Sequence, residues 1–130
     1  MSSKDKKNFL KNNIQSMSEK TLFEKIIDRE ISSKIIYEDN FCIAIEDINP
    51  QAPVHILLIP KKPIAKFSDF QKNDKELIAH LFLKVNEVAA ICNISENFRI
   101  NINNGAEAGQ EVFHLHVHIL GGRKFSWPPG

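Results

Sequence analysis

The chain has few cysteines, no long apolar run and no signal segment, and each absence excludes a class of protein. Among its 130 residues are only two cysteines, Cys42 and Cys92, and they form no CxxC pair. This argues against a disulfide framework or a thiolate zinc site and favours two core cysteines. No apolar stretch approaches the roughly 20 residues of a membrane span, and no apolar segment follows the N-terminal lysines. We therefore expect a soluble cytoplasmic protein that does not bind a membrane.

Net charge is also nearly absent, because seventeen basic residues offset sixteen acidic ones and leave a charge of +1. A nucleic-acid-binding domain would show a strong basic excess, so we expect no nucleic-acid partner. A small phosphate-bearing ligand is still allowed, since its site needs local donors rather than global charge. The hydrophobic share of 42% and the length are those of one ordinary globular domain. Residues 1–18, rich in Lys, Asn and Ser, are expected to be a flexible extension.

Helical and strand-like patterns alternate along the remaining residues. A capping box at Thr21 and Glu24 opens a short helix that we expect to end near Arg29. Asn73 can cap a second helix, whose broad apolar face runs to about Cys92. Strands are expected at 35–37, 41–45, 55–60, 98–103 and 113–120. Two helices with about five strands, mostly joined by hairpins, predict an α+β domain on an antiparallel sheet.

The last predicted strand carries three of the five histidines at every second position, as His114, His116 and His118. Successive side chains of a strand point to opposite faces, so the three imidazoles are expected to share one face. The apolar residues between them should share the other face and pack on the core. These residues are Phe113, Leu115, Val117 and Ile119.

Three interpretations of this histidine row remain open from the residues alone. It can be the polar face of a half-exposed strand, although such faces usually mix Thr, Lys, Glu and Ser. It can be a zinc site, because His-x-His on a strand chelates zinc and His55 or His118 can add a ligand. It can also perform covalent phosphoryl chemistry, with one imidazole as nucleophile and its neighbours as proton donors. The glycines of loop 104–110 would then let backbone N–H groups approach an anion.

Several motifs together resemble one family. The run 109–123, GQEVFHLHVHILGGR, is similar to the signature of the histidine triad superfamily, in which histidines alternate with apolar residues. Segments 23–27, 47–53, 59–62 and 127–130 resemble the histidine triad nucleotide-binding branch, known as Hint. The resemblance runs from Thr21 to Gly130. It implies a single histidine triad domain over 19–130 with a C-terminal tail over 123–130, built on a five-stranded antiparallel sheet with two helices.

The resemblance to Hint implies a purine nucleoside phosphoramidase that needs no metal or cofactor. Such an enzyme hydrolyses the P–N bond of nucleoside 5′-phosphoramidates and aminoacyl adenylates, with a purine nucleotide of the AMP or GMP type as partner. His116 corresponds to the nucleophile, which forms a nucleotidyl-histidine before water releases the nucleoside monophosphate. His118 corresponds to the residue that contacts the phosphate and protonates the leaving nitrogen. His114 and His55 correspond to residues that orient the nucleophile.

The nucleotide contacts follow from the same resemblance. Asn103 and the backbone N–H groups near Gly109, Glu111 and Val112 are expected to bind the phosphate, and Asp47 the ribose hydroxyls. Glu111 departs from the Ser common in eukaryotic relatives, and we expect it to alter how the leaving group is handled. The expected base pocket is apolar and consists of Phe23, Ile26, Ile45, Ile48 and Leu57.

Hint proteins are homodimers whose sheets join into one ten-stranded sheet, and the C-terminal Trp of one subunit reaches the active site of the other. The resemblance assigns that part to Trp127. Two alternative functions remain: a dinucleoside polyphosphate hydrolase of the same superfamily, and a nucleotide-binding interaction module in which catalysis is incidental.

Overall fold

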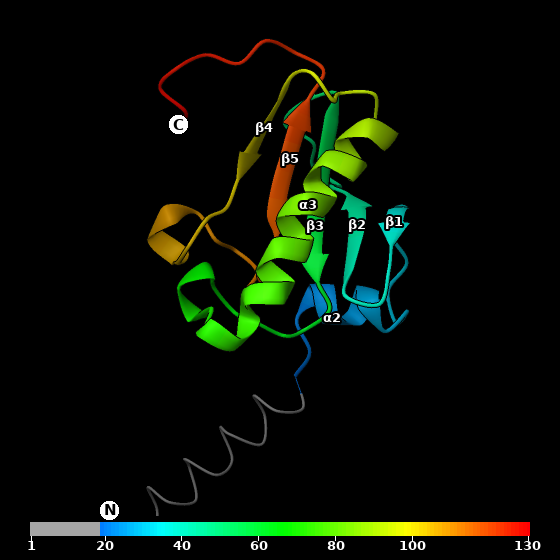
Figure 1. Cartoon of the computed structure of the whole chain (residues 1–130), viewed down its shortest axis with the longest axis vertical. Coiled ribbons are helices and arrows are strands. Elements are labelled where there is room, and N and C mark those ends of the chain that lie inside the picture. Colours follow the sequence, from blue (N-terminus) through cyan, green and yellow to red (C-terminus); the bar gives the residue numbers. More distant parts are fainter. Residues whose placement is uncertain (1–18) are drawn as a thin grey trace, which may run out of the picture.

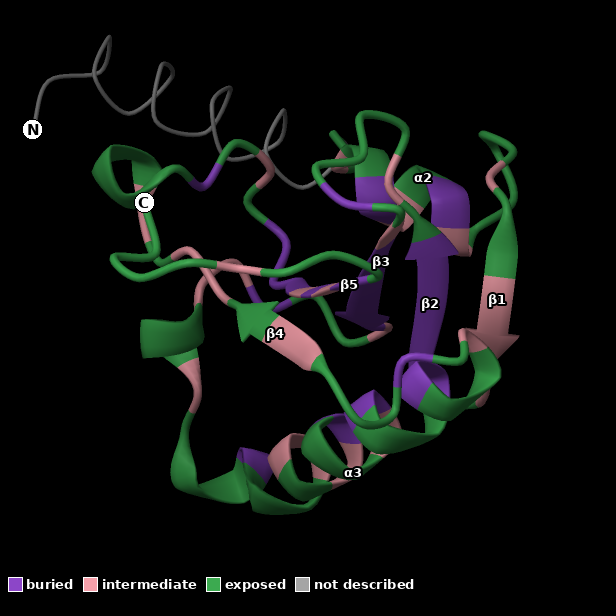
Figure 2. Ribbon diagram, turned by 90° about the horizontal axis from the view of Figure 1, so that it is seen from above, coloured by how far each residue is buried: buried purple, intermediate pink, exposed green. Residues whose placement is uncertain are grey.

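The computed structural model describes residues 19–130, and the expected flexible extension over residues 1–18 lies outside the described residues. A five-stranded sheet with the order β1-β2-β3-β5-β4 forms its centre, and every neighbouring pair is antiparallel. The strands are β1 Ile35–Glu38, β2 Cys42–Glu46, β3 Val54–Pro60, β4 Phe98–Asn101 and β5 Val117–Gly121. Two helices, α2 Leu22–Ile27 and α3 Lys75–Ile91, cover opposite faces (Figures 1 and 2). The α+β prediction is confirmed.

Alternation along the central strands produces two separate apolar clusters, one under each helix. In β2, four consecutive residues are buried because both faces of this strand are covered. The larger cluster, here called the α3 cluster, includes Cys42, Ala44, Ile56, Leu58, Leu81, Val85, Val88, Val117 and Ile119. The smaller one, the α2 cluster, consists of Phe23, Ile26, Ile43, Ile45, Leu57 and Ile59. The predicted core position of Cys42 is confirmed, since its side chain is fully buried.

The predicted start of α2 is confirmed, whereas the predicted start of α3 is not. The capping box of α2 is present: Glu24 N–H donates to Thr21 Oγ at 3.2 Å, and Thr21 N–H donates to the Glu24 carboxylate at 3.4 Å. For α3 the predicted cap at Asn73 is wrong, because a 3₁₀ turn over Lys72–Asp74 precedes the helix. Asp74 accepts from Gln71 N–H at 2.9 Å and from Lys62 Nζ at 2.6 Å, which fixes that turn instead.

The histidine strand is shorter than its sequence predicts. β5 begins only at Val117, so His114 and His116 precede the regular strand. The preceding segment is diverted because Leu115 N–H donates to Ile64 O at 2.7 Å, outside the sheet. Phe113, expected to face the core, is 46% exposed, which corrects that prediction. The predicted alternation nevertheless holds from residue 114 onward, with Leu115, Val117 and Ile119 in the α3 cluster.

The remaining differences are in loops. β4 ends at Asn101, two residues before the predicted end, and a 3₁₀ turn Ala106–Ala108 lies between β4 and β5. Gly105 and Gly109 flank that turn with φ of 96° and 98°, a region that L side chains rarely adopt. Among residues 19–130, no helix has both the length and the apolar character needed to cross a membrane.

Candidate active site

A cavity of about 480 Å³ opens on the α2 face of the sheet. Strands β2, β3 and β5 form its floor, α2 forms one wall, and the loops after β2 and before β5 complete it. All the predicted site residues except His114 and Trp127 line this cavity. They are Phe23, Ile26, Ile45, Asp47, Ile48, His55, Leu57, Asn103, Gly109, Glu111, Val112, His116 and His118.

His116 presents an unprotonated ring nitrogen to this cavity. Its side chain is 9% exposed, and Nδ1 lies 2.8 Å from the backbone oxygen of His114. A carbonyl only accepts, so Nδ1 carries the proton and Nε2 keeps its lone pair. The ring packs edge-on against Phe23, with 4.8 Å between ring centroids. Burial lowers the pKa of His116, which keeps the imidazole neutral and nucleophilic at neutral pH.

His55 and His118 form a pair whose proton positions are also set by the backbone. Gln51 N–H donates to His55 Nδ1 at 3.0 Å, so the proton of neutral His55 is on Nε2. That nitrogen lies 2.9 Å from His118 Nδ1, which therefore accepts. The remaining proton of His118 is then on Nε2. Burial, followed by the nearby His116 and His55 rings, lowers the pKa of His118 to about 4.

His114 lies beneath the cavity rather than in it. It is 1% exposed, and its Nε2 donates to Pro60 O at 2.7 Å, while Nδ1 has no hydrogen-bond partner. Burial lowers the pKa of His114, so the ring stays neutral. The ring thus anchors its own backbone to the end of β3, and the carbonyl of that backbone orients His116. The orienting contact is made by the backbone and not by the imidazole.

Asp47 lies just after β2 and lines the cavity beside His55. Its Oδ1 accepts from Asn49 N–H at 2.8 Å, and Oδ2 lies 3.4 Å from His55 Nε2. His55 is neutral, because burial lowers its pKa, and its proton has the shorter contact to His118. Asp47 Oδ2 is therefore available to accept a hydrogen bond from a ligand. Beside it, Ile48 is 94% exposed and has its whole side chain free to cover a ligand.

The loop before β5 supplies donors. The Nδ2 of Asn101 donates to Asn103 Oδ1 at 2.8 Å, which turns the Asn103 amide nitrogen toward Gly109 O, 3.5 Å away. Among the residues that the structure describes, none accepts from the backbone N–H groups of Glu111 and Val112. These two N–H groups and Asn103 Nδ2 are suited to oxygen atoms of an anion. Within 19–130 the Glu111 carboxylate has no ion-pair partner.

Two groups of side chains have the composition of a metal site. Asp47, His55 and His118 place ligand atoms within 4.8 Å of one another, as do Asp39, Cys42 and His80. In the first group, the facing nitrogens of the histidines share a proton at 2.9 Å, and a metal would have to displace it. In the second, Asp39 already accepts from four groups: Tyr37 OH, His80 Nε2 and the N–H groups of Phe41 and Cys42. Both arrangements are those of closed hydrogen-bond networks.

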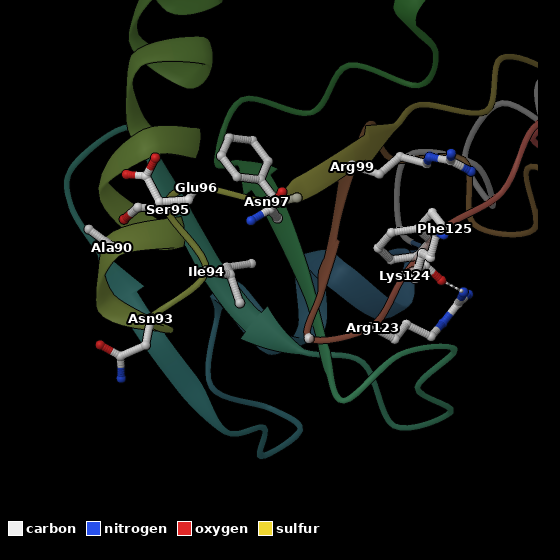
Figure 3. Close-up of a pocket in the computed structure, with 12 residues that line it drawn as sticks. Ala90, Asn93, Ile94, Ser95, Glu96, Asn97, Arg99, Arg123, Lys124 and Phe125 are labelled. Carbon is white, nitrogen blue, oxygen red and sulfur yellow. Dashed lines mark hydrogen bonds between the residues drawn. The ribbon is translucent and has the colours of Figure 1, made fainter.

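Trp127 is not placed with the other predicted residues. It is 82% exposed on the tail that follows β5, and it does not line the cavity. A larger hollow of about 990 Å³ lies near that tail, between the end of α3 and β4, and contains none of the predicted site residues. Its side chains include Arg99 and Arg123, which lie against the ring of Phe125 (Figure 3).

A small α+β sheet with alternating histidines entering its last strand, above a cavity lined by apolar and anion-binding groups, defines a histidine triad protein. The HIT domain family model matches residues 28–125, and the chain belongs to this family. It is 61% identical to an uncharacterised HIT-like protein of Synechocystis over 114 residues, 88% of this chain and all of that one. A HIT family hydrolase from Legionella pneumophila superposes with a TM-score of 0.83 at 43% identity, covering 85% of this chain and all of the other. A histidine triad nucleotide-binding protein from Candida albicans matches with a TM-score of 0.72 at 27% identity, covering 85% of each chain.

Proposed function

We propose that this chain belongs to the Hint branch and hydrolyses the P–N bond of purine nucleoside 5′-phosphoramidates, including aminoacyl adenylates. The observation that carries the proposal is the position of the ring proton on each of two neighbouring histidines in the cavity. His116 offers a lone pair at Nε2, and its neighbour His118 offers a proton at Nε2. Replacing an amine on phosphorus requires both a nucleophile and a proton for the departing nitrogen. Related structures named as HIT family hydrolases and as a histidine triad nucleotide-binding protein support the proposal.

The first step is attack of His116 Nε2 on the α-phosphorus. A P–N bond to the histidine forms as the P–N bond to the amine breaks, and the leaving nitrogen takes a proton from His118. The N–H groups of Glu111 and Val112, with Asn103, stabilise the charge on the phosphoryl oxygens. In the second step, water attacks the nucleotidyl-His116, and His118 Nε2 accepts its proton. Nucleoside monophosphate leaves, His116 returns to its starting tautomer, and His118 releases its extra proton to solvent.

Substrate binding supplies the protonation that the first step needs. In the free protein His118 is neutral at pH 7, because its pKa is about 4. An anionic phosphoryl group beside the ring favours its charged form and raises that pKa. The imidazolium then forms when the phosphate is in place. Its second proton is on Nδ1, the N–H of His55 Nε2 turns to Asp47 Oδ2, and the Nε2 proton of His118 is transferred to the leaving nitrogen. The site is thereby a poor acid until the substrate occupies it.

The nucleoside half of the substrate is assigned to Asp47 and to the apolar residues beside α2. Asp47 Oδ2 accepts from the ribose hydroxyls, and the purine lies among Phe23, Ile26 and Ile48. Ile45 and Leu57 form the apolar floor beneath it. Ser32 and Ser33 also line the cavity, so the apolar walls alone do not select adenine over guanine.

The proposed functional unit is a homodimer. β4 is one of the two edge strands of the sheet, and the tail that follows β5 runs past β4 (Figure 1). Pairing two β4 strands gives a ten-stranded sheet and covers the β4 edge of each protomer. The exposed Trp127 then extends toward the second cavity. Light scattering at micromolar concentration should give twice the mass of 14.8 kDa, whereas the monomer mass would contradict this part of the proposal.

The enzymatic proposal is tested by release of a fluorescent amine from an adenosine 5′-phosphoramidate, with and without a chelator. We expect turnover by the wild type in both conditions and a collapse of turnover in His116→Ala. Turnover that the chelator abolishes would favour a metal at Asp47, His55 and His118. No turnover in the wild type would contradict the proposal.

A further inference from the structure

Gln110 has a buried polar side chain that the mechanism above does not use. It is 3% exposed and does not line the cavity, although Gly109 and Glu111 on either side of it do. A buried amide left without partners costs about 1–3 kcal/mol, so the groups that it bonds indicate what it holds together.

The Gln110 amide is fully used. Its Nε2 donates to Ala65 O at 2.7 Å and to Val112 O at 3.0 Å, and its Oε1 accepts from Gly105 N–H at 2.9 Å. The orientation of the amide follows from these partners, because the reversed amide would point Oε1 at two carbonyl oxygens. A glutamine side chain is needed to make all three bonds.

These bonds join both ends of the loop between β4 and β5 to the connection after β3. Gly105 precedes the 3₁₀ turn of that loop, Val112 leads into the histidines, and Ala65 belongs to the connection after β3. The same connection accepts from Leu115 N–H through Ile64 O at 2.7 Å. The segment that carries the free N–H groups of Glu111 and Val112 is therefore fixed on both sides, although it has no regular structure of its own.

We propose that Gln110 is a positioning residue for the phosphoryl group of the substrate. It holds the N–H groups of Glu111 and Val112 at a fixed place relative to His116 Nε2 and does not contact the ligand. This inference rests on the proposed function and deepens it. Donors that stabilise developing charge are effective only when they are held in place before the reaction, and displacements of about 1 Å can cost about 10²-fold in rate.

Two variants of Gln110 and one matched control test the inference. Gln110→Glu keeps the volume and one acceptor but places an oxygen against two carbonyls, and Gln110→Met removes every polar contact. Gln71→Met makes the same change at an exposed glutamine that does not line the cavity. We expect kcat to fall about 10²-fold in both Gln110 variants and to stay within about twofold in the control. Circular dichroism and urea unfolding identify the variants that fold, and Gln110→Glu serves if Gln110→Met does not.

Binding of AMP and of adenosine separates positioning from a general loss of structure. Adenosine uses α2, the floor of the sheet and Asp47, whereas AMP also uses the loop that Gln110 fixes. We expect AMP affinity to fall about tenfold or more in the Gln110 variants while adenosine affinity is unchanged. Equal losses for both ligands, or wild-type kcat in a folded Gln110 variant, would overturn the inference. A wild type that binds both ligands without turnover contradicts the proposed function instead, and the binding comparison still decides the role of Gln110.

A pH series adds a readout specific to the missing donors. Protonation of the carboxyl in Gln110→Glu restores one O–H donor toward the two carbonyls. The ratio of variant to wild-type kcat should therefore rise as the pH is lowered. A ratio that is independent of pH would show that the lost donors are not the cause of the defect.

Discussion

The two faces of the sheet are built from alternate residues of the same strands, yet one is closed and the other is reactive. On the α3 face, a helix over Lys75–Ile91 covers the sheet and the cluster beneath it is apolar. On the α2 face, the helix has only six residues and leaves an open cavity beside the α2 cluster. His55, His116 and His118 line that cavity, and Figure 2 shows the two helices on opposite sides of the sheet. The difference indicates that the site exists because α2 is too short to cover its face of the sheet.

The largest expected effect comes from His116→Ala, on the open face. Losing the nucleophile should lower kcat at least about 10³-fold, because the chemical step has no substitute for Nε2. Ile119, three residues on and fully buried on the closed face, is the matched control. Ile119→Ala should cost about 2–5 kcal/mol in the free energy of unfolding and retain kcat per folded molecule. Activity assays with urea unfolding of both variants test this division, and an inactive but folded Ile119→Ala would break it.

Leu57 and Leu58 sharpen the same comparison because they are neighbours in β3 on opposite faces. Leu58 is fully buried in the α3 cluster, so Leu58→Ala should cost about 2–5 kcal/mol in unfolding free energy with little change in KM. Leu57 lies on the cavity floor, and Leu57→Ala should raise KM about tenfold at a smaller cost in stability. Equal effects of the two substitutions on KM would contradict the separation of the faces.

Asp47→Ala should remove the preference for ribose. The carboxylate is available to accept from both hydroxyls, so the wild type should favour a ribonucleoside substrate over its 2′-deoxy analogue by about tenfold or more in kcat/KM. In the variant this ratio should approach one, because only the ribonucleoside loses a contact. Parallel loss on both substrates would show that Asp47 supports the fold of the loop instead.

The smallest expected effect is on the pH dependence of stability. Burial lowers the pKa of His55, His114, His116 and His118 in the folded chain. As the pH falls from about 6.5, these side chains take up protons in the unfolded chain while they remain neutral in the folded one. Stability should therefore be complete above about pH 6.5 and decline toward pH 4, the region of the His118 pKa. Urea unfolding of His118→Gln should show a shallower decline than the wild type, and an unchanged slope would contradict this assignment.

How much the sequence predicts depends on the range of the interaction. The capping box at Thr21, the hairpin before Cys42 and the alternation of Leu115, Val117 and Ile119 are local patterns, and the structure contains them. The start of β5 is not local, because it is decided by the bond from Leu115 N–H to Ile64 O.

Sequence patterns do not predict the tautomers of the histidines either. They are assigned by backbone groups, the N–H of Gln51 and the carbonyl of His114, which can be located only in three dimensions. The same holds for Gln110, whose partners lie at both ends of its own loop and in the connection after β3. The one feature of the sequence that points to Gln110 is its place as a polar residue between two loop residues that are predicted to bind phosphate.

The stereochemical course at phosphorus tests the central claim most directly. In the proposed mechanism, His116 displaces the amine and water then displaces His116, and each in-line displacement inverts the phosphorus centre. A substrate made chiral at phosphorus with sulfur and oxygen isotopes should therefore give product with net retention of configuration. Net inversion would show a single direct attack by water and would contradict a nucleotidyl-His116 intermediate.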